Sequence, residues 1–131
     1  MMTSTDIGNA LFLDVKPFGI ATYQGFNVPR GKVTAERIVI HPKRSNAQTY
    51  VYKSFAEVNF CVPDLEDGQA DLILLNERER QAKRFFDYAN VYDGTTYNVE
   101  YESSEIVEER DLECHFVNVR ILITFLNTTN K

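Results

Sequence analysis

The run ECHFVNVR, from Glu113 to Arg120, places a carboxylate, a thiol and an imidazole side by side. Such groups can bind zinc or carry out nucleophilic catalysis. The surrounding alternation predicts a strand over residues 112–127, however, and neighbouring side chains of a strand point to opposite faces. We therefore expect Cys114 and His115 to lie on opposite faces of a sheet, where they cannot easily share a metal ion or form a thiolate–imidazolium pair.

The imidazole has two interpretations. The odd positions from His115 to Phe125 form the more apolar face of the predicted strand, which puts His115 at one end of the row that faces the core. A hydrogen-bonded structural imidazole is the usual outcome at such a position, and a ligand or catalytic role is the alternative.

Other chemical motifs are weak. The chain holds two cysteines and two histidines, and Cys61, Cys114, His41 and His115 lack the close-paired spacing of zinc sites. We expect free thiols rather than a disulfide, although Cys61 and Cys114 could lie on adjacent strands. A GxSxG elbow is missing, and the Gly31-Lys32 pair lacks the upstream glycine of a phosphate-binding loop. The sequence thus predicts no catalytic, metal or cofactor site and gives these four residues no specific role.

Composition and charge limit the function classes. The 131 residues, 44% hydrophobic and 25% charged, fit a single folded domain over 1–131. The net charge of −5 is uneven: residues 1–65 carry seven Lys and Arg against five Asp and Glu, and residues 66–131 carry seven against fourteen. This argues against a DNA-binding protein, which needs a coherent basic face. No apolar run approaches the roughly 18 to 20 residues of a membrane span, and the N-terminus does not resemble a signal peptide, so we expect an intracellular protein.

The periodicity of the chain predicts the elements that position these residues. The first is a helix over 6–16, capped by Ser4 or Thr5, followed by a long loop over 19–35 with room for a short strand. A strand at 38–40 stopped by Pro42 and an exposed loop at 43–49 come next. A strand at 50–62 follows, and its apolar even positions are predicted to face the core: Ala56, Val58, Phe60 and Val62. A turn at 63–69, a helix at 70–89, a turn at Asp93-Gly94, a strand at 95–101 and an acidic hairpin tip at 102–111 then lead to the final strand. We expect residues 127–131 to form a frayed tail.

This order of elements predicts the fold class. Helix, strand, strand, helix, strand and strand in sequence, α-β-β-α-β-β, indicate an α+β domain: a single antiparallel or mixed β-sheet with two helices packed on it. In the second helix, an apolar stripe of Leu72, Leu75, Ala82, Phe86 and Ala89 is predicted to face the sheet.

The size and element order resemble those of a phage protein family. The loop YQGFNVPRG, the hairpin ERIVIHPKRSNAQTYVYKSFAEVNFCVP, the helix ADLILLNERERQAKRFFDYA and a closing hairpin are similar to the tail-terminator or tail-completion proteins of long-tailed bacteriophages. The resemblance spans nearly the whole chain. It rests on size, on element order and on the pattern of alternating strands and an amphipathic helix rather than on an invariant motif.

The resemblance implies a non-enzymatic structural protein of a phage or prophage virion, made in the cytoplasm of the bacterial host. Such a subunit forms a ring, commonly a hexamer, that terminates the tail tube and joins it to the head connector. Its implied partners are other copies of itself, the tail-tube and head-connector proteins, and DNA that passes without specific binding. Neither a cofactor nor a membrane is implied.

Two charged groups are candidate surfaces in such a ring. Arg30, Lys32, Lys43 and Arg44 lie on the two early predicted loops and are candidates for a subunit or partner interface. Glu105, Glu108 and Glu109 lie on the predicted acidic tip, where they could line the lumen and repel DNA. A plain solvated surface is the alternative for both groups. The alternative function is a small soluble adaptor domain that binds a protein partner through the 19–35 loop.

Overall fold

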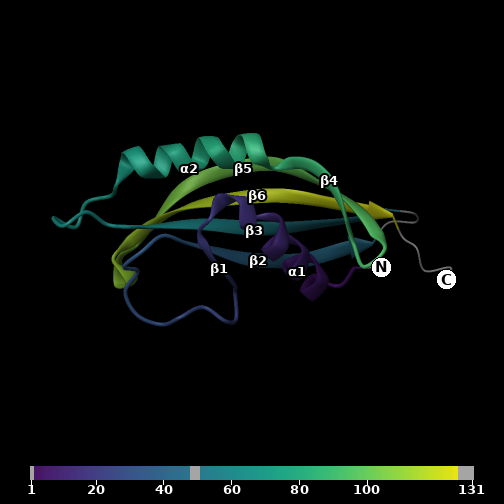
Figure 1. Cartoon of the computed structure of the whole chain (residues 1–131), viewed down its shortest axis with the longest axis horizontal. Helices are drawn as coiled ribbons and strands as arrows, with labels where there is room; N and C mark the ends of the chain where they lie inside the picture. Colours follow the sequence, from purple (N-terminus) through teal and green to yellow (C-terminus); the bar gives the residue numbers. More distant parts are fainter. Residues whose placement is uncertain (1, 48–50, 127–131) are drawn as a thin grey trace.

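The protein forms one curled sheet with two helices (Figure 1). The computed structural model describes residues 2–47 and 51–126, so the tail predicted at 127–131 and the end of the loop predicted at 43–49 lie outside it. The sheet has six strands in the order β1-β2-β3-β6-β5-β4. The helices are α1 (Ser4–Asp14) and α2 (Leu72–Phe85), the 3-10 turns are η1 (Lys16–Phe18) and η2 (Arg110–Leu112), and the strands are β1 (Ala21–Gln24), β2 (Arg37–Ala47), β3 (Val51–Pro63), β4 (Asp87–Tyr92), β5 (Thr95–Glu109) and β6 (Cys114–Leu126).

The predicted α+β class is confirmed, but the predicted order of elements is incomplete. Two further strands, β1 and β4, form the two edges of the sheet. β1 lies inside the predicted 19–35 loop and pairs in parallel with β2, so the sheet is mixed. β4 occupies the end of the predicted 70–89 helix and pairs with β5. Both are short edge strands, and each is defined by its partner strand more than by its own sequence pattern.

α1 begins earlier than its pattern predicts. The Thr3 hydroxyl accepts a hydrogen bond from the Asp6 backbone N–H at 3.0 Å, and the Asp6 carboxylate accepts one from the Thr3 N–H at 3.0 Å. This reciprocal capping box starts the helix at Ser4. The predicted caps, Ser4 and Thr5, therefore lie within the helix.

α2 is shorter than predicted at its C-terminal end. Asp71 caps its start by accepting a hydrogen bond from the Leu74 N–H at 3.2 Å. The helix ends at Phe85 because the Phe86 carbonyl accepts a bond from the Tyr101 N–H of β5, which draws the chain into the sheet. Leu72, predicted to be buried, is 62% exposed.

Two predicted turns are strand instead. β2 continues through Pro42 to Ala47, and its register with β3 shifts between Pro42 and Ser45. A proline is tolerated there because this part of β2 has a strand on one side only. The predicted 102–111 tip is also mostly strand, since β5 extends to Glu109 and the chain turns through η2 and Glu113, whose φ is 54°.

The core lies between the helices and one face of the sheet. Buried residues of α1 and α2 pack there against the predicted inward rows of β3 and β6. Those rows are Ala56, Val58, Phe60 and Val62 on β3, and Val117, Val119, Ile121, Ile123 and Phe125 on β6, all of which are buried. We call the opposite side of the sheet the helix-free face.

One carboxylate ties α1 to the far edge of the sheet. Asp14, the last residue of α1, accepts hydrogen bonds from the hydroxyls of Tyr88 and Tyr97 at 2.6 Å each, and from the Asn90 amide at 2.9 Å. Burial, reinforced by the hydrogen bond to Asp14, raises the pKa of both Tyr88 and Tyr97. These contacts position β4 and β5 relative to the first helix.

Candidate assembly surfaces

Both edges of the sheet are only partly covered. Within the described residues, β1 pairs with β2 from Arg37 to Ile40, and beyond that point β2 pairs with β3 alone. At the other edge, β4 pairs with β5 from Thr95 to Glu100, and the remainder of β5 has β6 as its strand neighbour. Uncovered strand edges present backbone N–H and C=O groups that another chain can bind.

The predicted acidic group lies on the uncovered part of β5. Glu105, Glu108 and Glu109 are strand residues, so the expected acidic loop is wrong in this respect. Register pairs share a face: Glu105 lies opposite Asn118 and Glu109 opposite Cys114, both on the helix-free face. Glu108 lies on the other face. The three glutamates therefore share an edge, but they do not form one cluster.

The predicted basic group is divided between a loop and a strand. Arg30 and Lys32 lie in the loop of residues 25–36 between β1 and β2, which we call the 25–36 loop. Lys43 and Arg44 lie on β2 rather than on a loop. The Lys32 ammonium is 2.9 Å from the Glu113 carboxylate.

Ion pairs reduce the charge separation that the sequence suggests. Lys32–Glu113 joins the early, basic half of the chain to the late, acidic half, and Lys43 lies 3.5 Å from Glu57 on the neighbouring strand. The two halves therefore meet at Lys32–Glu113, and Lys43 is paired within the early half itself. Arg30 remains exposed, with no ion pair among the described residues.

Phe26 is the most exposed apolar side chain on the described surface, with an accessibility of 105%. The Gly25 N–H donates to the Ile40 carbonyl at 2.9 Å, and the Asn27 N–H to the Gln24 carbonyl at 2.8 Å, so backbone bonds hold the start of this loop. A Cβ at Gly25 would lie 2.6 Å from His41 Nδ1, which favours glycine here. A fixed, solvated aromatic is typical of a contact surface.

His115 is hydrogen-bonded, as the structural interpretation predicts. Its Nδ1 lies 2.7 Å from Asp64 Oδ1, and both side chains are largely buried. The Asp64 N–H donates to the Glu113 carbonyl at 3.0 Å, which fixes the carboxylate beside the imidazole. The sequence did not identify Asp64, which follows Pro63 in a predicted turn.

Other chemical groups are dispersed. Among residues 2–47 and 51–126, no group of three or more His, Cys, Asp and Glu side chains is placed to hold a metal ion. Cys61 and Cys114 are free thiols that lie close together on neighbouring strands of the helix-free face. In the same part of the chain, no helix is long and apolar enough to cross a membrane.

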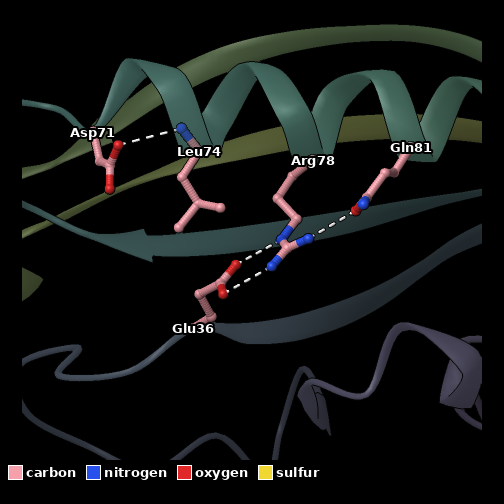
Figure 2. Close-up of polar contacts among 5 residues, drawn as sticks. All are labelled: Glu36, Asp71, Leu74, Arg78 and Gln81. Carbon is pink, nitrogen blue, oxygen red and sulfur yellow. Dashed lines mark hydrogen bonds and ion pairs between the residues drawn. The ribbon is translucent and has the colours of Figure 1, made fainter.

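A bidentate ion pair anchors α2 beside the start of β2 (Figure 2). Arg78 Nε and Nη2 donate to the two carboxylate oxygens of Glu36 at 2.7 and 2.9 Å, and Nη1 donates to Gln81 Oε1 at 2.8 Å. Glu36 ends the 25–36 loop, so this pair connects that loop to the helix. The planar guanidinium suits this two-pronged contact better than an ammonium would.

We expect Arg78→Ala to lower the free energy of unfolding by about 1 to 2 kcal/mol, since the pair is mostly shielded from water. Arg78→Lys, the matched control, keeps the charge but should recover less than half of that loss. Urea unfolding followed by circular dichroism measures both values. Wild-type stability in Arg78→Lys would show that the fork geometry is unimportant.

Comparisons with known proteins give the fold class and no function. No family model matches the chain, and no curated protein matches it. A solved structure with 12% sequence identity superposes on it with a TM-score of 0.62, covering all of both chains. At that identity the likeness shows the fold alone. The class established here is an α+β protein with a single curled, mixed six-stranded sheet and both helices on one face.

Proposed function

We propose that the chain is a non-enzymatic structural protein of a phage or prophage tail. In this proposal, copies form a ring, commonly of six, that terminates the tail tube and joins it to the head connector. The observation that carries it is the pair of unlike, partly uncovered sheet edges. The sequence resemblance to tail-terminator proteins motivates the same proposal.

Because the two edges of the sheet differ, they favour head-to-tail contacts between copies over contacts with two-fold symmetry. A ring needs two different surfaces on each copy, so that one surface of a subunit binds the other surface of the next. One edge carries the 25–36 loop with Phe26 and Arg30, and the other carries Glu105 and Glu109. The 25–36 loop presents an exposed aromatic beside a cation, and the uncovered part of β5 presents backbone N–H and C=O groups, so the two edges suit such an interface.

The acidic edge also suits a lumen. Glu105 and Glu109 project from the helix-free face of β5. If this part of β5 lines the ring, like-charge repulsion would let DNA pass without binding. The tail-tube and head-connector proteins are the partners proposed for the two ends of the ring.

We expect size-exclusion chromatography with light scattering to give a mass several times the 15.1 kDa of one chain. Phe26→Ser should shift the population to monomer without loss of stability, because the side chain is fully exposed. The matched control is Leu13→Ser on α1, which removes another exposed apolar side chain and should leave the oligomer intact. An oligomer unaffected by Phe26→Ser would exclude this loop from the interface.

The exposure of Phe26 equally favours the second candidate function, an adaptor domain that binds another protein through the 19–35 loop. If the protein is an adaptor, the wild-type chain should be monomeric and should capture a protein partner in a pull-down. Phe26→Ser should abolish that capture. A wild-type oligomer that Phe26→Ser dissociates would instead support the ring.

A further inference from the structure

A cavity of about 320 Å³ lies on the helix-free face, where β3 ends and β6 begins. Val28 of the 25–36 loop and Leu112 of η2 contribute to its wall. The Val33 N–H donates to the Leu112 carbonyl at 2.9 Å, which holds the loop against this end of the sheet. Besides its apolar lining, the cavity contains Arg37 and the two thiols, Cys61 and Cys114. Its remaining polar side chains are His41, Asn59 and Glu109.

The two thiols share one side of the sheet. Cys61 lies opposite Phe116 in the register and Cys114 lies opposite Pro63, so the cysteines are diagonal neighbours on the same face. Both belong to one small buried cluster with Val33 and are 7% and 1% exposed. They stand at the ends of their strands, where the backbone can adjust most easily to bring two sulfurs together.

Arg37 supplies an unusual positive charge in this cavity. It is 9% exposed, and its Nη1 donates to the Pro29 carbonyl at 3.2 Å. Its buried Nε has no hydrogen-bond partner among the described residues. A buried guanidinium with an unused donor attracts an anion, whether a thiolate or the carboxylate of a ligand.

The surroundings distinguish the two sulfurs. A hydrogen bond from the Cys114 thiol lowers the pKa of Cys61. Burial and the nearby Glu109 carboxylate oppose this shift, whereas the Arg37 charge adds to it. The same hydrogen bond, together with burial, raises the pKa of Cys114. Cys61 is also the more exposed of the two thiols, at 7% against 1% for Cys114, which makes it the one that a reagent reaches first.

We propose that Cys61 and Cys114 form a redox-active dithiol that reduces small anionic disulfides of the glutathione type, with Arg37 holding a carboxylate of the reagent. The Cys61 thiolate attacks one sulfur of the reagent, breaks its S–S bond and releases one thiolate. Cys114 then loses its proton and attacks the Cys61 sulfur, which releases the second thiolate. Two protein thiols become one disulfide, and the external disulfide becomes two thiols. The dithiol chemistry does not rest on the assembly proposed above, although Val28 of the 25–36 loop and Glu109 of the acidic edge line this cavity.

The full-length reduced protein, incubated with oxidised glutathione, provides the test. Intact mass should fall by about 2 Da as both thiols are lost, and peptide mapping should find the Cys61–Cys114 bond. Cys114→Ser should accumulate one glutathione on Cys61, Cys61→Ser should react at least ten times more slowly, and Arg37→Lys should slow the wild-type reaction severalfold. Circular dichroism checks that each variant is folded.

Three results would overturn the proposal. One is wild-type protein whose thiols react only after denaturation, which would make them ordinary core residues. Another is a wild-type glutathione adduct that never resolves to the internal disulfide. The third is a folded Cys61→Ser variant that reacts as fast as the wild type.

Discussion

Asp14→Ala is expected to destabilise the protein by about 3 to 5 kcal/mol, because it leaves the hydroxyls of Tyr88 and Tyr97 and the Asn90 amide without their acceptor. Each buried polar group that loses its partner costs about 1 to 3 kcal/mol. Tyr97 is 2% exposed, so water cannot replace the carboxylate there without rearrangement. Urea unfolding monitored by circular dichroism gives the change directly.

The matched control for this substitution is Asp14→Asn, which keeps one acceptor oxygen of similar geometry. It should recover roughly half of the loss. A destabilisation by Asp14→Ala of less than 1 kcal/mol would mean that the carboxylate does not hold α1 against β4 and β5 in solution.

The same tyrosines predict a loss of stability in alkali. The pKa of each is raised in the folded protein, so the folded state keeps protons that the unfolded chain loses above pH ~10. Their contribution is fully present below that pH and decreases as the pH rises. While the folded hydroxyls stay protonated, the loss is about 1.4 kcal/mol per tyrosine for each pH unit.

Unfolding free energies measured from pH 8 to pH ~11.5 test this dependence. Tyr88→Phe should remove about half of the slope that these two tyrosines contribute above pH ~10, whatever its effect on stability at neutral pH. Tyr23→Phe is the matched control, since it removes a phenol outside the Asp14 network. A slope unchanged by Tyr88→Phe would contradict the assignment.

The regular parts of the fold could be predicted from sequence because their periodicity matches their burial. The alternation around Val58 and Val119 gave the inward rows of β3 and β6 correctly. The turn at Asp93-Gly94 was equally clear, and both residues have positive φ, 48° and 79°. These signals lie within a few residues of one another, so the elements can be predicted without knowing which strand pairs with which.

Of the two edge strands, β1 was allowed for only as a short strand within the 19–35 loop and β4 was missed, because their structure depends on distant residues. β1 exists through pairing with Arg37–Ile40, and α2 gives way to β4 where Phe86 meets Tyr101. Pro42 normally stops a strand, but an uncovered edge needs no N–H on its outer side. Tertiary pairing outweighed local propensity at each of these positions.

The candidate surfaces were only partly predictable. The role of the 19–35 loop as a partner surface stays a prediction, and an aromatic between Gly25 and Asn27 was the available signal for Phe26. The ion pair of Lys32 with Glu113 could not be seen in the sequence, because it depends on the loop folding back to η2. The environment of Arg37 depends on the same loop, which brings the Pro29 carbonyl to its side chain.

Assembly is the central claim, and negative-stain electron microscopy of the purified full-length chain tests it most directly. The proposal predicts closed rings of about six copies with a central opening. The proposal would be contradicted by uniform single-subunit particles at every concentration. Light scattering would then give a mass of 15.1 kDa, even when tail-tube protein is present.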